Sequence, residues 1–299
     1  MASLKDVKAK IGGVKKTRQI TKAMNMVAAS RLRGAQLTME GFRPYAQKFG
    51  EVLGRLSSRA QGGASSPLLV PKPEVRNVQV ILCTSDRGLC GGFNTSLISA
   101  AEKLYKQYSE KGVPVVFTLF GKKGRDWARS GKLTSVAEHI GVVGTRVPFN
   151  VASKTGTALI NGFLGGEVDE VFLVYSRFDS MSRQTPVVQQ LLPIPAISAE
   201  ETKGGEEKEQ KPELEHLCEP SAEGLLSKLF PRHISVQIYK ALLETSTSEH
   251  AARMMAMDNA TKACNDMLDQ LTLVYNKARQ AAITKELMDI VGGAEALKG

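Results

Sequence analysis

The stretch with the clearest potential for chemistry is QVILCTSDRGLCGGFN, residues 79–94, in which an apolar run is followed by a glycine-rich turn and a helical pattern. Strand, turn and helix in this order form the usual phosphate site of an α/β domain, at the amino end of the helix. The spacing of Gly88, Gly91 and Gly92 matches neither GxGxxG nor GxxxxGK[ST], however, and no lysine follows. We therefore interpret the segment as a tight turn packed against another surface, and not as a nucleotide site.

The histidines and cysteines do not form a recognisable reactive pattern. The four histidines are far apart and form no HExxH motif, so surface or packing roles are favoured over metal ligation. The four cysteines are also scattered, which favours reduced thiols in a cytosolic compartment over a disulfide scaffold or a zinc site. No GxSxG motif is present. The sequence predicts no active site, no cofactor and no metal among these residues: His139, His216, His233, His250, Cys83, Cys90, Cys218 and Cys264.

Residues 75–198 alternate strand and helix signals. Short β-branched apolar runs are separated by segments with helical spacing, which predicts a small Rossmann-like α/β domain with a mainly parallel sheet. The last run has flanking prolines and is expected to be an edge strand. The expected strands are 78–84, 113–120, 170–175 and 187–193, and the expected helices are 93–111, 121–130 and 149–162.

The N-terminal segment, residues 1–60, predicts a long helix. Its apolar residues step by three and four, which places them on one stripe, and the stripe is expected to continue after a small phase shift. The first part of the stripe is Leu4, Val7, Ile11 and Val14, and the second part is Ile20, Met24, Val27, Ala28 and Leu32.

The C-terminal segment, residues 221–299, predicts a second and longer helix. Sixty residues from Arg232 to Val291 contain neither glycine nor proline. A helix of that length extends about 90 Å, and its apolar residues have coiled-coil spacing. The expected seam is Ala260, Cys264, Met267, Leu271, Val274, Ala278 and Ala281, resuming at Leu287, Ile290, Ala294 and Leu297.

Two terminal helices that flank a compact domain predict an antiparallel intramolecular coiled coil with the α/β domain inserted at its base. A linker, residues 60–73, and an acidic loop, residues 199–220, connect the parts. The loop carries eight glutamates against three lysines and is expected to be solvated. An ordinary helical bundle is less favoured, because few other helices exist to cover these faces.

The net charge of +10 lies entirely in the first 59 residues, which hold thirteen lysines and arginines but three acidic residues. Such a segment needs an acidic partner, and nucleic acid, an anionic membrane surface and an acidic protein surface all remain open. No apolar run approaches the roughly 18 to 20 residues that span a bilayer, which argues against a membrane-spanning chain.

Four segments together resemble the gamma subunit family of the F-type ATP synthase. They are KTRQITKAMNMVAASRLRGAQ (16–36), TSDRGLCGGFN (84–94), SEHAARMMAMDNAT (248–261) and LTLVYNKARQAAITKELMDIVGGAEAL (271–297). The resemblance implies that the coiled coil stands in the bore of a hexagonal head of alternating alpha and beta subunits. It also implies that the α/β domain lies at the foot with the epsilon subunit and the membrane c-ring, and that the catalytic sites belong to beta.

The resemblance further implies that particular residues of this rotor shaft contact the surrounding subunits. For each of them a solvated charge or a seam position is the alternative. The implied rotor–stator contacts are Met24, Arg87, Arg253, Arg279, Gln280, Thr284 and Glu286, and the implied basic face is Lys15, Lys16, Arg18, Lys22, Arg31 and Arg33.

Two other classes of protein share parts of the pattern. A coiled coil that binds nucleic acid would use the basic helix, but residues 1–41 contain no aromatic side chain to interleave with bases. A Rossmann-type oxidoreductase would use the α/β domain, but the dinucleotide fingerprint is missing. The chain opens with MASLKDVKAKI and no Arg/Ser-rich transit peptide, which favours the cytoplasmic face of a bacterial plasma membrane and leaves a mature organellar chain open.

Overall fold

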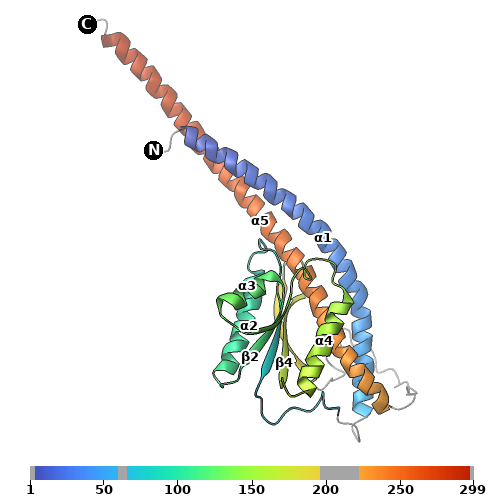
Figure 1. The fold of residues 1–299 in the computed structure, drawn as a ribbon. Coiled ribbons are helices and arrows are strands. Elements are labelled where there is room, and N and C mark those ends of the chain that lie inside the picture. Colours follow the sequence, from blue (N-terminus) through green and yellow to red (C-terminus); the bar gives the residue numbers. More distant parts are fainter. Residues whose placement is uncertain (1–3, 60–65, 196–221, 297–299) are drawn as a thin grey trace. The chain divides into compact units, whose positions relative to one another are not determined.

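The computed structural model describes residues 4–59, 66–195 and 222–296, so the acidic loop 199–220 lies outside the described residues (Figure 1). Two long helices run at the ends of the chain, α1 (Leu4–Arg59) and α5 (Ala222–Ala296). The chain divides into two compact units, of which the first joins Met1–Ala29 to Arg253–Gly299 and the second is Ser30–Ala252. We call them the shaft unit and the foot unit.

The foot unit contains a five-stranded sheet in the order β3-β2-β1-β4-β5. Strands β1 to β4 are parallel to their neighbours, and β5 pairs antiparallel with β4. This order is that of a Rossmann sheet, as the alternating sequence pattern predicted. The strands are β1 (Val78–Cys83), β2 (Val115–Phe120), β3 (Ser135–His139), β4 (Glu170–Phe178) and β5 (Gln184–Leu192), and the helices are α2 (Phe93–Ser109), α3 (Lys122–Ser130) and α4 (Phe149–Leu164).

Strand β3 is absent from the sequence prediction. Its five residues carry no clear alternation of buried and exposed side chains, and Val136 is 65% exposed. A short strand at the edge of a sheet needs little apolar sequence of its own, because its neighbour supplies the hydrogen bonds. Strand β5 also starts three residues earlier than expected, at Gln184.

Both faces of the sheet are covered by helices (Figure 1). Helices α2 and α3 pack on one face around Phe117, Leu97 and Leu104, which are all buried. Helices α4 and α5 lie on the other face, where Gly156 lets them approach closely. A Cβ atom at Gly156 would lie 2.9 Å from the Ser235 hydroxyl of α5.

In the shaft unit, α1 and α5 pair antiparallel along one continuous seam. Arg18 donates to Asn265 at 3.2 Å, Thr261 donates to Thr21 at 2.8 Å, and Asn25 donates to the carbonyl of Met254 at 2.8 Å. Residue numbers rise along α1 as they fall along α5, which is the predicted antiparallel arrangement.

The seam of α1 corrects the expected phase. Ile20 and Val27 are 60% and 55% exposed, while Thr21 is buried and Asn25 half-buried. The heptad spacing therefore continues from Val7 without a phase shift, because α5 supplies hydrogen-bonding partners that allow polar side chains into the seam.

The seam of α5 also differs from the expected one, because every second seam position is shifted by one residue. A shift of one residue turns the side chain by about 100° around the helix axis. The sequence offers two apolar stripes that both contain Cys264, Leu271 and Ala278. The observed stripe also contains Leu268, which is buried, and Tyr275, which is half-buried. Four of the residues expected in the seam are half-buried there: Ala260, Cys264, Leu271 and Ala278. The other three are exposed: Met267, Val274 and Ala281. The residue that follows each of them lies in the seam instead: Leu268, Tyr275 and Ala282.

Within the foot unit, α5 is buried on all sides between Ala241 and Ala252. Burial raises the pKa of the Glu244 carboxyl above its ordinary value, while nearby cations and the Phe178 N–H oppose the rise. Arg43 of α1 donates to the Phe178 carbonyl at 3.2 Å. Phe178 at the end of β4 is thus contacted by Arg43 of α1 and by Glu244 of α5. The opposing cations are Lys240, Arg43 and Arg177.

We predict that Asn25→Ala loosens the paired helices locally, because a part-buried hydrogen bond contributes about 1 kcal/mol. Amide hydrogen exchange within residues 15–29 should accelerate about fivefold, which corresponds to that free energy. The control is Gln19→Ala on the exposed side of α1. Equal exchange in the two variants would contradict the seam as described.

We predict that Glu244→Gln increases the free energy of unfolding at pH 7 by on the order of 1 kcal/mol, which raises the thermal midpoint. A carboxyl with a raised folded-state pKa stabilises the fold fully below its unfolded pKa and loses that contribution as pH rises through the folded pKa. The advantage of glutamine should therefore vanish near pH 4. Thermal melts at both pH values test this, with exposed Glu110→Gln as control. A destabilised Glu244→Gln at pH 7 would show that the carboxylate is needed in charged form.

Candidate functional site

The glycine-rich loop after β1 is braced by its own polar side chains. The Asp86 carboxylate accepts the N–H of Lys122 at the start of α3 and the N–H of Gly141, both at 2.9 Å. Thr84 accepts the Gly124 N–H at 2.8 Å. The N–H donors at the start of α3 are thus engaged by residues of the loop after β1.

The carboxyl end of β4, next to β1 in the sheet, contacts helix α5. Ser176 donates its N–H to Thr245 at 3.3 Å and accepts a hydrogen bond from Ser248 at 3.3 Å. Gly144 donates its N–H to Ser246 at 3.1 Å. A Rossmann sheet binds its ligand in the crevice at this edge, between the strands where the order reverses. In this chain a helix packs there through short hydroxyl side chains.

The described residues hold no cluster of three or more His, Cys, Asp or Glu side chains with the geometry of a metal site. None of the helices in these ranges is long and apolar enough to cross a bilayer.

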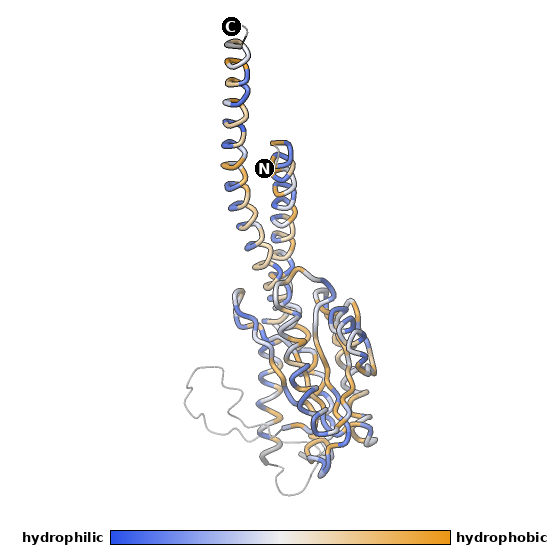
Figure 2. The backbone as a smooth tube through the Cα atoms, turned by 90° about the vertical axis from the view of Figure 1, so that its left-hand side faces the viewer, coloured by the Kyte–Doolittle hydropathy of each residue, from blue (hydrophilic) through white to orange (hydrophobic). Residues whose placement is uncertain are grey.

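The end of α5 presents an exposed apolar face. Counting from the Arg18–Asn265 bond, Leu4 lies level with the turn that contains Arg279, so the following turns have no partner from α1. Figure 2 shows these turns running beyond the start of α1. Leu287 and Ile290, expected in the seam, are 59% and 71% exposed. The full set beyond Arg279 is Ile283, Leu287, Met288, Ile290 and Val291.

An exposed row of large apolar side chains on a helix is unusual for a free surface and marks an interaction site. The sequence carried the signal, since Leu287 and Ile290 have heptad spacing. It did not indicate that α1 ends before reaching them. Polar residues flank the row on the same turns: Arg279, Gln280, Thr284 and Glu286 are all exposed, and Thr284 donates to the Gln280 carbonyl at 3.0 Å.

Met24 and Arg253 lie at one level of the shaft unit. Met24 directly precedes Asn25, and Arg253 directly precedes Met254. Asn25 and Met254 are joined by a hydrogen bond. Met24 is half-buried and Arg253 is 8% exposed, so both contribute to packing as well as to any surface. Arg87 belongs to the foot unit, where it is exposed in the loop after β1.

Most of the expected basic face is exposed, and one member is not. Arg18 is half-buried on the seam, where it donates to Asn265. The other residues are free of the seam and project from α1: Lys15, Lys16, Lys22, Arg31 and Arg33.

Comparison of the sequence with protein families and with individual relatives points to ATP synthase in each case. The family model described as ATP synthase matches residues 3–297. The chain is similar to the ATP synthase gamma chain of Desulfosudis oleivorans, with 61% identity over all of both chains. It is 58% identical to that of Desulforapulum autotrophicum, over 99% of this chain and 100% of the relative.

Solved structures agree with the fold. A chain of the Tetrahymena thermophila mitochondrial ATP synthase central stalk and c-ring is 26% identical, with a TM-score of 0.55 over 81% of this chain and 99% of that one. A chain of the Euglena gracilis mitochondrial ATP synthase rotor has a TM-score of 0.61 at 19% identity, over 94% and 98% of the two chains. The chain therefore belongs to the ATP synthase gamma chain family.

Proposed function

We propose that this chain is the central rotor shaft of a proton-translocating ATP synthase. It couples rotation of the membrane c-ring to sequential conformational change in the catalytic sites of the beta subunits, in synthesis and in hydrolysis of ATP. The observation that carries the proposal is the exposed apolar face at the end of α5, above a seam that pairs the helix with α1.

A shaft acts on catalytic sites by contacts that change with its angle. A partner can shift the equilibrium between two states of a site only by the difference in its interaction free energy with those states. The end of α5 is suited to this role because it presents different side chains on different sides, with apolar residues beside Arg279, Gln280 and Glu286. Turning it would present each beta subunit with a different surface in succession.

The basic face would meet acidic surfaces of the head. Long-range attraction between opposite charges depends weakly on detailed geometry, which suits a contact that slides. The exposed lysines and arginines of α1 provide it. Met24 and Arg253 would contact beta where the two helices are joined by the Asn25–Met254 bond, and Arg87 would reach a beta subunit from the foot.

The remaining parts of the proposal concern organisation and place. The sequence-derived limits are 1–60 and 221–299 for the two helices of the coiled coil, 75–198 for the α/β domain and 199–220 for the acidic loop. The chain would work with alpha, beta, epsilon and the c-ring, and without nucleic acid. It would lie at the cytoplasmic face of the bacterial plasma membrane, peripheral to it, and would contribute no catalytic site of its own.

Reconstitution tests the proposal. The chain is mixed with separately purified alpha and beta subunits, and the mixture is analysed by size exclusion and ATP hydrolysis. We expect one complex that contains all three chains and gains ATPase activity, while the chain alone hydrolyses nothing. Separate elution with unchanged activity would contradict the assignment of its partners, and salt-resistant retention on DNA would favour the nucleic-acid alternative.

We predict that Arg279→Ala with Gln280→Ala lowers ATP hydrolysis and synthesis by the reassembled complex about thirtyfold, because a charge-assisted and a neutral hydrogen bond together contribute about 2 kcal/mol. The same dipeptide occurs at Arg183 and Gln184 in the foot unit, and its double alanine variant is the control. Rates equal to the control would remove Arg279 and Gln280 from the path that transmits torque.

We predict that Arg31→Glu with Arg33→Glu weakens association with the head more at low salt than at high salt, because exposed charges are screened over about 10 Å at 0.1 M ionic strength. Dissociation constants at two salt concentrations measure the effect. Lys106→Glu with Lys154→Glu, both exposed in the foot unit, controls for net charge. An effect that does not depend on salt would rule out an electrostatic role.

A further inference from the structure

The imidazole of His233 lies between α5 and α1 in the foot unit. Its ring stacks on Phe49 of α1, with the ring centroids 6.2 Å apart and the ring planes at 12° to each other. The residue is half-buried, and its Nδ1 atom, which is shielded from solvent, forms no hydrogen bond with any residue that the structure describes. Buried polar atoms nearly always have a hydrogen-bond partner, so this one is an exception that needs a physical reason.

Aromatic side chains join α1, α4 and α5 next to this contact. The rings of Phe42 and Tyr239 meet edge to face at 4.8 Å, and those of Phe149 and Tyr239 at 5.3 Å. Arg232 donates to the Tyr45 hydroxyl at 3.3 Å, and its guanidinium lies 6.0 Å from the centroid of the Phe149 ring. The aromatic cluster that holds the three helices together is therefore Phe42, Tyr45, Phe49, Phe149, His233 and Tyr239.

The surroundings of His233 oppose a positive charge on its ring. Burial lowers the pKa of the His233 imidazole to about 4, and Lys240, two turns further along α5, adds to the decrease. The Glu51 carboxylate of α1 is paired with Lys48 at 2.7 Å. A protonated imidazole would thus face mainly positive charge. The charged residues on the neighbouring turns are Lys48, Glu51 and Arg55 of α1, Lys154 of α4, and Lys228, Arg232 and Lys240 of α5.

We propose that His233 is an acid-sensitive latch, which holds the C-terminal half of α1 on α5 while its ring is neutral and releases it when the ring is protonated. An imidazolium ion in a buried aromatic contact loses its hydration, and Nδ1 has no acceptor within the described ranges to replace it. Local separation of the two helices would hydrate the ring, because parts of a protein can open without unfolding the whole. The latch belongs to the fold of the foot unit, so this inference does not rest on the proposed function.

The direction of the pH dependence follows from the two pKa values of the ring. A histidine whose pKa is lower in the closed contact than in the opened one destabilises the contact as the pH falls through the higher value. With the ordinary pKa of 6.5 when opened and about 4 when closed, opening should become about tenfold more frequent from pH 7.5 to pH 5.5. At pH 7.5 the ring is neutral in both states, and the contact has its full stability.

Amide hydrogen exchange of the full chain at these two pH values tests the latch, after correction for the intrinsic pH dependence of exchange. We expect protection in residues 42–56 and 226–239 to fall about tenfold from pH 7.5 to pH 5.5 in the unsubstituted chain. His233→Phe keeps a ring against Phe49 but cannot be protonated, so its protection should agree within about twofold at the two pH values. A loss in His233→Phe as large as in the unsubstituted chain would overturn the proposal.

His139→Phe is the matched control for the removal of a histidine. His139 also stacks on a phenylalanine, Phe120, with ring centroids 4.6 Å apart, but it lies at the end of β3. His139→Phe should keep the tenfold loss of protection in the two helices. If it removed the pH dependence as completely as His233→Phe does, the assignment of the latch to His233 would be wrong.

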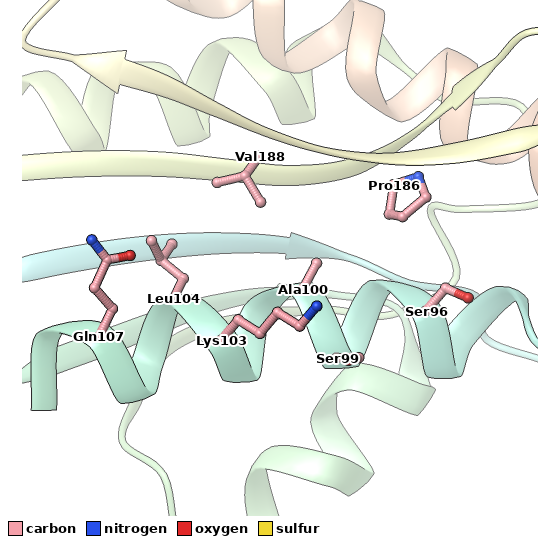
Figure 3. A pocket seen from close by; sticks show the side chains of 8 residues that line it. All are labelled: Ser96, Ser99, Ala100, Lys103, Leu104, Gln107, Pro186 and Val188. Atoms are coloured by element: carbon pink, nitrogen blue, oxygen red, sulfur yellow. The ribbon is translucent and has the colours of Figure 1, made fainter. Parts of the chain in front are cut away.

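A histidine titration followed by NMR tests the same proposal without any substitution. The His233 ring should stay neutral down to about pH 5 in the folded chain, whereas a midpoint near the ordinary 6.5 would overturn the latch. Lys240→Gln should raise the midpoint, because it removes a repelling charge. Lys103→Gln is its control, since Lys103 lies on α2 beside the groove between α2 and β5, on the opposite face of the sheet (Figure 3). Equal midpoints in the two lysine variants would overturn the local electrostatic basis of the latch.

Discussion

The antiparallel pairing of α1 with α5 is the interaction on which the other features depend. In proteins, most of the stability of a helix comes from burying its apolar face against another element, and little comes from the intrinsic helix propensity of its residues. In the shaft unit, that face is supplied by the other end of the same chain. The hydrogen bonds between Arg18 and Asn265 and between Asn25 and Met254 join residues more than two hundred positions apart.

The polar residues in the seam determine how the two helices are paired. A seam of alanines and small residues would permit several registers of similar free energy. Thr21 against Thr261 and Asn25 against a backbone carbonyl satisfy their hydrogen bonds in one register, and sliding by a turn would leave these groups unpaired. The seam therefore gives up some apolar burial and gains a defined alignment. The alignment in turn fixes which turns of α5 extend past Leu4, the first described residue of α1.

The foot unit shows how a Rossmann sheet can serve a structural role. The edge that would receive a ligand packs against α5 through Ser176, Thr245 and Ser248, and the turn after β1 is held by Asp86. These contacts use short side chains, so the helix can lie close to the ends of the strands. The same fold that binds dinucleotides elsewhere here holds the base of a helix.

Much of this arrangement could be predicted from residue types. Alternating runs predicted the Rossmann-like sheet, and a stretch without glycine or proline predicted α5. The phase of the seam could not be predicted, because Ile20 and Val27 form an apolar stripe as good as the one that contains Thr21 and Asn25. Only the partner helix decides between them. Leu287 and Ile290 were assigned to the seam for the same reason, since periodicity cannot show where a partner ends.

Direct observation of rotation tests the central claim most sharply. The alpha and beta subunits are fixed to a surface, and a probe is attached to the foot unit of this chain at an engineered cysteine. With ATP present, we expect the probe to turn in one direction, with one pause for each catalytic beta subunit in a revolution. Sustained hydrolysis by the complex with a probe that stays still, or that swings without direction, would contradict the role of this chain as the shaft.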